Sequence, residues 1–412
     1  MPEAAPVPRG PWPAGINNRA DELAMPVGTV RDSINVDPSR EGIFSLRTGY
    51  TIQAPGTSIR GALSIGRQIL LADGESLVCF DSTTNSSVPL GPIAGAGRFT
   101  GDVFNAELFF CTENECLRYK DGVLRSWGVT TVSYQPVPVV VAGGLVAGEY
   151  QCAATFVDAY GDEGGTTAPL QITLGENAGL QFTLPTPPEG GSVRLYVSPV
   201  QGGELYLQYQ GVGAYLCTSV ATDSARLETL NLRAPVPGDF ICEHNGSLAI
   251  AEGKTLWLTE PLRPHLRNQA KRFYQFPKPI DGIVSADGGL FVLSDKSYFL
   301  SAAESDQPLQ TDPLDYGGVR GSMMKVIGPP GPNGITLDYA TWMTQYGLAR
   351  SDGQGGVILL SAANFLPEIS SHGSSGFIEH NGNQLVVHTL HRTDSDNTLR
   401  ANDYSEAEIV TP

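Results

Sequence analysis

Apolar and polar positions follow one pattern that occurs four times in this chain. In each copy an apolar run leads through a short polar turn into a second apolar run. This pattern predicts a β-hairpin whose tight turn takes the positive φ that Gly and Asn tolerate. The four copies, each with its turn residues, are Gln68–Phe80 (Asp73, Gly74), Glu107–Tyr119 (Glu113, Asn114), Ser247–Leu258 (Glu252, Gly253) and Gly289–Leu300 (Asp295, Lys296).

The spacing of these hairpins indicates a structural repeat. Their first apolar runs begin at Ile69, Leu108, Leu248 and Leu290, so the steps between them are 39, 140 and 42 residues. A period of about 40 residues is typical of propeller blades, because a lone hairpin cannot bury its apolar face and a ring of such units can. We therefore predict an all-β fold, a β-propeller of about six blades, or about seven if the termini complete another one.

The long step indicates an inserted domain. One blade accounts for about 40 of its residues, which leaves on the order of 100, the size of a small β-sandwich. Residues 136–237 fit this insert, since Pro-rich hinges lie at both ends and short alternating segments lie between them. We predict a fibronectin type III-like sandwich with strands at Gly148–Val157, Leu170–Leu174, Leu180–Leu184, Ser192–Val197, Leu205–Val212 and Ala214–Val220.

These patterns divide the chain into four parts. Residues 1–60 form an N-terminal arm and docking segment, with one short helix around residues 20–23. Residues 61–135 form the first part of the propeller, 136–237 the sandwich and 238–412 the second part. The sequence Glu-His-Asn-Gly occurs at Glu243–Gly246 and again at Glu379–Gly382, each time before an apolar strand, which supports a common repeat.

The chain is strongly acidic, with a net charge of -17. Such a surface disfavours non-specific binding to DNA. It fits either ordinary solubility or a negatively charged passage to which DNA does not adhere. No segment reaches the roughly 18 uncharged apolar residues of a membrane helix, and the N-terminus lacks the basic and apolar regions of a secretion signal. We predict no membrane-spanning segment.

The six cysteines do not indicate a metal centre. They are irregularly spaced and mostly fall within predicted strands, as buried free thiols do, which is consistent with synthesis in the cytoplasm. Cys111 and Cys116 face each other across one hairpin turn, but a zinc site needs about two further ligands nearby. Asp158, Asp162 and Glu163 could bind calcium. Their spacing lacks the alternation of a calcium loop, so a solvated loop is the other interpretation.

No catalytic motif is evident. The sequence has no Gly-x-Ser-x-Gly in a strand–turn–helix context, no Walker loop, no dinucleotide fingerprint and no His-Glu-x-x-His. We predict a protein that is not an enzyme and that needs no cofactor.

One basic segment stands out in the acidic chain. It follows the hairpin at 247–258 and is predicted to be a long loop between blades. It faces solvent or meets an acidic patch on a neighbouring subunit. Its cations are Arg263, Arg267, Lys271, Arg272 and Lys278.

The N-terminal region resembles the start of bacteriophage virion proteins. Residues 14–19 read small-Gly-x-Asn-Asn-Arg, residues 32–37 read Asp-x-x-Asn-Val-Asp, and residues 47–50 read Arg-x-Gly-Tyr. This series is similar to that of the tail hub or nozzle proteins of short-tailed phages, also called packaged-DNA stabilisation proteins. Leu256–His265 and Trp342–Leu348 resemble further segments of the same family.

The resemblance implies a structural virion protein. It would be one subunit of a homo-hexameric ring below the head-to-tail adaptor, extending the DNA channel, helping to retain and deliver packaged DNA, and carrying other tail parts such as fibres. The DNA would pass through without specific binding. The protein would be located in the virion tail after assembly in the host cytoplasm. The candidate assembly contacts are Asn17, Asn18, Arg19, Arg31, Arg263, His265 and Arg267.

Two questions stay open at this point. Residues 2–37 either make contacts with another subunit or the adaptor, or only bind to their own propeller. The whole protein could instead be a receptor- or carbohydrate-binding tail propeller, or a glycan-active enzyme. Ring assembly on an adaptor, tight glycan binding by a monomer, and sugar release that depends on single carboxylates would distinguish these three functions.

Overall fold

The computed structural model describes residues 11–33, 36–38, 42–46, 56–95, 97–301, 310–330, 336–352, 354–380, 383–392 and 405–410. The fold is all-β, as predicted. The helical part of the described chain is one 3-10 turn, η1 (Glu22–Ala24), which begins where Asp21 accepts a hydrogen bond from the Leu23 N–H at 2.9 Å. The chain divides into two compact units, Gly56–Gln275 and Met1–Pro55 together with Phe276–Pro412.

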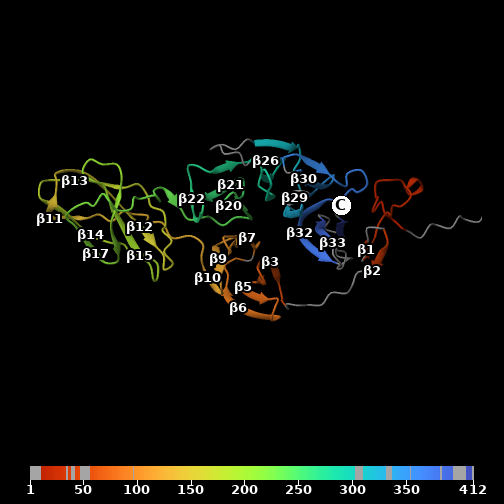
Figure 1. Ribbon diagram of the computed structural model, residues 1–412, viewed down its shortest axis with the longest axis horizontal. Coiled ribbons are helices and arrows are strands. Elements are labelled where there is room, and N and C mark those ends of the chain that lie inside the picture. The colour runs from red at the N-terminus through yellow and green to blue at the C-terminus, as the bar shows by residue number, and fades with distance from the viewer. Residues whose placement is uncertain are drawn as a thin grey trace, which may run out of the picture. The chain divides into compact units, whose positions relative to one another are not determined.

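Three small antiparallel sheets of the unit 56–275 place consecutive strands side by side, as propeller blades do (Figure 1). The first comprises β3 (Ile59–Ile65), β4 (Gln68–Asp73), β5 (Ser76–Asp81) and β6 (Ser86–Pro92). The second comprises β7 (Thr100–Phe104), β8 (Glu107–Cys111), β9 (Cys116–Lys120) and β10 (Val123–Ser126). The third comprises β19 (Phe240–His244), β20 (Ser247–Glu252), β21 (Thr255–Glu260) and β22 (Arg263–Asn268), with β18 (Leu232–Arg233) beside β22 and β23 (Phe273–Gln275) beside β21. The predicted hairpins form the middle strands of these sheets.

Strand β8 shows how neighbouring sheets pack. Alternate residues of a strand point to opposite faces. Leu108 and Phe110 therefore join a core with Leu70 and Leu77 of the first sheet. Phe109 and Cys111 join another core with Ile241, Leu248 and Ile250 of the third sheet. The second sheet is thus buried on both faces, and its first strand, β7, lies beside β3 and β19.

The hairpin turns are of two kinds. Gly74 (φ 58°) and Gly253 (φ 55°) take the expected left-handed conformation. The prediction of positive φ is wrong at Glu113–Asn114 and at Asp295–Lys296, because those turns are longer. In the first of them the Thr112 hydroxyl accepts hydrogen bonds from the N–H groups of Asn114 and Glu115, both at 3.3 Å, so no residue has to be left-handed.

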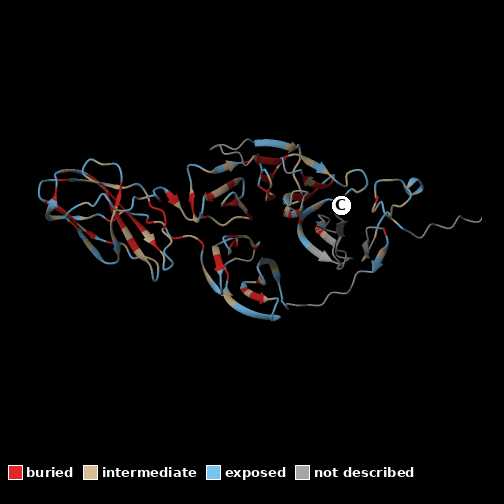
Figure 2. Cartoon of the chain, in the orientation of Figure 1, coloured by how far each residue is buried: buried red, intermediate tan, exposed pale blue. Residues whose placement is uncertain are grey.

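Two further sheets of the same unit pack face to face as a sandwich. One consists of β11 (Val139–Leu145), β14 (Ala178–Thr183) and β17 (Ala214–Cys217). The other consists of β13 (Leu170–Leu174), β12 (Gly148–Val157), β15 (Ser192–Val197) and β16 (Tyr206–Gly211). They share one core that includes Tyr150, Leu180, Phe182 and Leu195, whose strands carry the buried stretches in Figure 2. The six predicted strands are present, and the apolar stretch around 137–148 adds the edge strand β11.

Over its described residues, the other unit contains three more sheets and one short strand pair. The first sheet consists of β24 (Gly282–Ala286), β25 (Gly289–Leu293), β26 (Ser297–Ser301) and β27 (Gln310–Leu314). The second consists of β28 (Met324–Pro330), β29 (Thr336–Thr344), β30 (Gly347–Ser351) and β31 (Val357–Leu359). The third consists of β32 (Ser370–His380), β33 (Asn383–Arg392) and β34 (Ser405–Val410). The strand pair is β1 (Val36–Pro38) with β2 (Phe44–Leu46). Phe291 and Trp342 pack at 5.5 Å between ring centroids and join the first two sheets in one core.

The Glu-His-Asn-Gly repeat has a structural counterpart. The first copy ends β19 and forms the turn into β20 with Asn245 (φ 48°) and Gly246 (φ 70°). The second copy begins at the end of β32, and β33 starts at Asn383. Its last two residues, like residues 1–10 of the predicted arm and 393–404 of the polar C-terminal stretch, lie outside the described residues.

Candidate functional site

Asn17 organises the N-terminal segment that resembles phage proteins. Its side chain is buried, and its Oδ1 accepts hydrogen bonds from the N–H groups of Arg19 (3.2 Å) and Ala20 (2.9 Å). Its own N–H donates to the Val30 carbonyl at 2.7 Å, which closes residues 17–30 into a loop. Arg31 donates from Nη1 to the Ala20 carbonyl at 3.2 Å and supports the same loop. The first residue of the Asn-Asn-Arg sequence, Asn17, therefore stabilises the backbone of its own loop.

Asn18 and Arg19 attach this loop to the segment between β31 and β32. The Asn18 side chain donates to the Leu366 carbonyl at 2.9 Å and accepts from the Leu366 N–H at 2.8 Å. Its backbone N–H donates to the Asn364 carbonyl at 3.0 Å, and Arg19 donates to the Ala362 carbonyl. Four of the predicted assembly residues therefore make contacts within their own chain: Asn17, Asn18, Arg19 and Arg31. Such contacts are expected if residues 2–37 bind to their own propeller.

The attached loop presents two apolar side chains to solvent. Leu23 is 99% exposed and Val27 is 97% exposed, and both lie between the anchoring residues and the return at Val30. A single exposed apolar residue on a surface is ordinary. Leu23 and Val27 are two such residues, and both lie on a loop held in place by polar contacts.

The basic segment is only in part the predicted loop, since Arg263 and Arg267 lie on a strand, whereas Lys271, Arg272 and Lys278 lie outside the strands. Residues 263–268 form strand β22, which pairs with both β21 and β18. Its charges are largely used within the chain: Arg263 forms an ion pair with Glu228, and Arg272 donates from Nη2 to the Ser247 hydroxyl at 2.9 Å. Arg263 thus has an acidic partner within its own chain, Glu228, which lies after the last sandwich strand.

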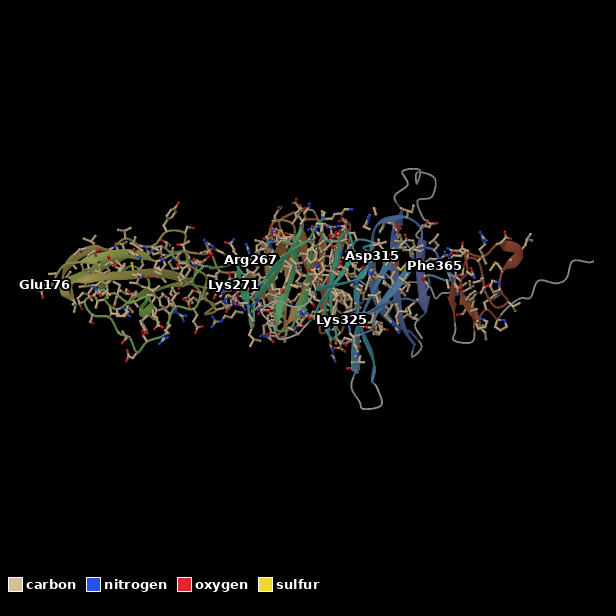
Figure 3. The ribbon with its side chains drawn as sticks, turned by 90° about the horizontal axis from the view of Figure 1, so that it is seen from above. Glu176, Arg267, Lys271, Asp315, Lys325 and Phe365 are labelled. Atoms are coloured by element: carbon tan, nitrogen blue, oxygen red, sulfur yellow. The ribbon has the colours of Figure 1, made fainter. Side chains whose placement is uncertain are left out.

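Arg267 is the buried member of the basic segment, with 5% of its surface exposed. Its guanidinium lies 4.4 Å from the centre of the Trp257 ring, and Nε donates to the Ala234 carbonyl at 3.1 Å. Burial lowers the pKa of Arg267, and its Nη1 has no hydrogen-bond partner in the described structure. Figure 3 places Arg267 and Lys271 at the end of the sandwich opposite Glu176, close to the three meander sheets of the same unit, β3–β6, β7–β10 and β18–β23.

His265 lies at the junction between the sandwich and those sheets. Its Nδ1 is 3.9 Å from the Asp162 carboxylate, and its side chain is only 12% exposed. Burial lowers the pKa of His265, which Asp162 partly opposes. His265 lines a cavity of about 360 Å³ together with Tyr160, Leu262 and Pro264.

Arg118 is the central residue of this junction, and the sequence did not reveal it. It lies on β9 with a side chain that is 3% exposed, and its Nη2 is 3.3 Å from Asp158 and 2.5 Å from Asp162. Arg125 pairs with Glu107 at 2.9 Å and lies 4.2 Å from the Tyr160 ring centre. Two features of the sequence could have predicted this pairing. Arg118 is the one Arg of a largely apolar hairpin, and the loop with Asp158 and Asp162 has no cation of its own. A buried charge needs a partner of opposite charge.

The acidic side chains of the sandwich loop are partly buried and paired, whereas residues 159–161 between them are exposed. Glu163 pairs with Arg194 at 2.7 Å and accepts hydrogen bonds from Thr155 and Tyr196, both at 2.6 Å. Within the described ranges, no three His, Cys, Asp or Glu side chains come together as metal ligands would. In the same part of the chain, no helix has the length and apolar character needed to cross a membrane.

Comparison with known proteins identifies no family. No family model matches the sequence, and no curated protein matches it. Solved structures that are similar to this chain match it weakly, as the following three show. BBS1N, crystallised in complex with ARL6DN, is 8% identical over 83% of this chain and 93% of its own, with a TM-score of 0.35. Saccharomyces cerevisiae Sqt1 is 11% identical over 74% of both chains, with a TM-score of 0.30. The N-terminal domain of Nup159 is 11% identical over 81% of this chain and 73% of its own, with a TM-score of 0.27. Similarities this weak carry no functional inference.

Proposed function

We propose that this protein is a structural subunit of a short-tailed phage tail, a nozzle or hub protein that acts by assembly and not by catalysis. It would form a ring below the head-to-tail adaptor, continue the DNA channel and help to retain and deliver the packaged DNA. The observation that carries the proposal is the N-terminal loop, whose phage-like Asn-Asn-Arg sequence fixes a surface with exposed Leu23 and Val27.

The proposal includes a closed propeller with an inserted type III-like sandwich. Its support is the strand order of the small sheets and the stacking of the first three through cores on both faces of β8. In the other unit, β24 lies against β28 and β29, and β28 lies against β32, so first strands again come together. Six sheets of this kind, outside the sandwich and counted over the described residues, match about six blades.

The distribution of charge supports passage of DNA without capture. Many of the cations are paired with carboxylates of the same chain, so they are less available for phosphate contacts. These pairs include Arg118, Arg125, Arg194, Arg226, Arg263, Lys296, Arg320 and Lys325. Together with the net charge of -17, this pairing favours a channel wall along which a duplex slides.

Electron microscopy of the purified protein, alone and with a head-to-tail adaptor, tests the proposal. We expect rings that stack on the adaptor. The double variant Leu23→Glu/Val27→Glu should stay folded and fail to join, since both side chains are exposed and their loss removes no internal contact.

Val212→Glu is the matched control, because Val212 is also exposed (59%) but lies on the sandwich. It should assemble normally if the N-terminal loop is the docking element. Normal ring formation by the double variant would show that the loop does not dock. A wild-type protein that stays monomeric with the adaptor and binds a cell-surface glycan tightly would favour the receptor-binding function instead.

A further inference from the structure

Two cysteines lie directly opposite each other at the end of the β8–β9 hairpin. Cys111 is the last residue of β8 and Cys116 is the first of β9, and the two are register partners in the ladder. Their sulfur atoms are 2.9 Å apart, so one thiol donates a hydrogen bond to the other. Directly opposed residues of an antiparallel pair have Cβ atoms about 4.5–5.5 Å apart, a range that meets the roughly 3.5–4.5 Å found in disulfides.

We propose that Cys111 and Cys116 form a reversible disulfide, with a small-molecule disulfide such as oxidised glutathione as the oxidant. The Cys116 thiolate attacks one sulfur of the external disulfide, whose S–S bond breaks and releases one thiolate. The Cys111 thiolate then attacks the Cys116 sulfur of the mixed disulfide and releases the second thiolate. The two protein thiols are oxidised, the external disulfide is reduced to two thiols, and the two protein protons pass to those products.

Exposure determines the order of these steps. Cys116 is partly exposed, whereas Cys111 is fully buried, so an external disulfide reaches Cys116 first. Cys111 is then already positioned to displace the mixed disulfide. The hydrogen bond between the two thiols and the burial of Cys116 raise the pKa of Cys116. The positive charge of Arg267 partly opposes this shift. The first step should therefore be slow at neutral pH and faster at alkaline pH.

The location of the pair gives the disulfide a structural effect. Cys111 belongs to the core shared by the second and third meander sheets, beside Trp127, Ile241 and Leu248. Its sulfur is also 4.0 Å from the Val236 carbonyl, on the segment that returns from the sandwich. Oxidation would fix the β8–β9 turn at the place where three parts of the same unit meet. This inference does not depend on the proposed function.

A redox titration of the full-length protein tests it. The protein is equilibrated with reduced and oxidised glutathione, alkylated with iodoacetamide and analysed by mass spectrometry. Because no Lys or Arg occurs between residues 99 and 117, both cysteines fall in one tryptic peptide that carries two labels or none. We expect the peptide to lose both labels, lose the mass of two hydrogens, and recover both labels after dithiothreitol.

Comparison with the unfolded chain makes the test specific. The same titration in urea measures the equilibrium constant for disulfide formation in a chain without the hairpin. In the native protein this constant should be at least about tenfold larger than in urea. Cys116→Ser should abolish the change, while Cys152→Ser, in the sandwich core, should leave it intact. An equal or lower preference in the native state, or a protein that stops at a glutathione adduct on Cys116, would overturn the proposal.

Discussion

The side-chain amide of Asn18 and the backbone of Leu366 form two reciprocal hydrogen bonds, of 2.9 and 2.8 Å, across 348 residues of sequence. An amide side chain can reproduce the donor and acceptor of a peptide group. Asn18 thus holds the N-terminal loop on the segment between β31 and β32, much as a neighbouring strand would.

Replacing Asn18 should loosen this loop without unfolding the protein. Asn18→Ala removes both bonds, which together contribute about 1–2 kcal/mol at this exposed site, so hydrogen exchange and proteolysis within residues 17–30 should speed up about tenfold. Thr29→Ala is the control, because its hydroxyl bonds only to the Pro26 carbonyl inside the loop. Unchanged protection in Asn18→Ala would show that other contacts hold the loop.

Arg118→Met should destabilise the unit 56–275 by about 2–4 kcal/mol, since it removes the nearest cation from two partly buried carboxylates, Asp158 and Asp162. Urea unfolding followed by tryptophan fluorescence measures the change. Arg226→Met removes an exposed pair with Glu204, with side chains 62% and 57% exposed, and should cost at most about 1 kcal/mol. Similar losses in the two variants would mean that the Arg118 network contributes little.

His388 should make the fold sensitive to acid. It is fully buried, and the Ser375 hydroxyl, which donates to the Ser322 carbonyl at 2.6 Å, accepts from its Nδ1 at 2.7 Å. Nε2 is then the unprotonated nitrogen, buried without a partner among the residues that the structure describes, and burial lowers the pKa of His388 from 6.5 to about 4.

Because the pKa of His388 is lower in the folded state, its neutral form stabilises the protein above pH 6.5, and that contribution is lost as the pH falls from 6.5 to about 4. The loss should approach about 3 kcal/mol. Urea unfolding at several pH values should therefore show a shallower pH dependence for His388→Gln than for the wild type. NMR titration of the His388 ring provides a second measurement, and an unshifted pKa would contradict the argument.

The purified protein should not bind duplex DNA at physiological salt. Arg267 is buried and Arg263 is paired with Glu228, so the basic segment has few cations left for phosphate contacts. Fluorescence anisotropy with a labelled duplex and a salt titration measure this directly. Binding tighter than about micromolar that weakens steeply with salt and is reduced by Lys271→Glu would instead indicate that this segment grips DNA.

The sandwich should be separable from the rest of the chain. Val132 and Leu230 each form an isolated β-bridge with Thr166, so they lie within about 10 Å of each other. A linker of about four residues can therefore replace the chain between Val132 and Leu230. This cut keeps β18 and the Ala234 carbonyl that binds Arg267, which removal of 136–237 would lose.

The shortened chain should also carry Arg118→Met, since Asp158 and Asp162 are gone and the remaining carboxylate, Glu107, lies farther from Arg118, at 3.8 Å. We expect a β-rich circular dichroism spectrum and cooperative unfolding. The separate fragment 130–231 should fold as well, because the sandwich has a core of its own. A remainder that is unfolded with and without Arg118→Met would show that the sandwich is not an autonomous insert.

The sequence alone determined the four hairpins and most strands of the sandwich. Alternation of apolar and polar residues is a local property, so the four hairpins and the strands from 148 to 217 could be located without knowledge of any partner. The step of 140 residues between hairpins likewise predicted an extra segment, and residues 139–217 form the two sheets of the sandwich.

Only the tertiary structure decided what the charged residues do. Residues 263–268 read as a loop because they are polar, yet they form β22, since β18 and β21 supply the backbone partners. Arg118 meets Asp158 and Asp162 across 40 and 44 residues, and Asn18 meets Leu366 across 348. The energy of a charge or an amide depends on burial and on a partner, and both are fixed only when distant segments come together.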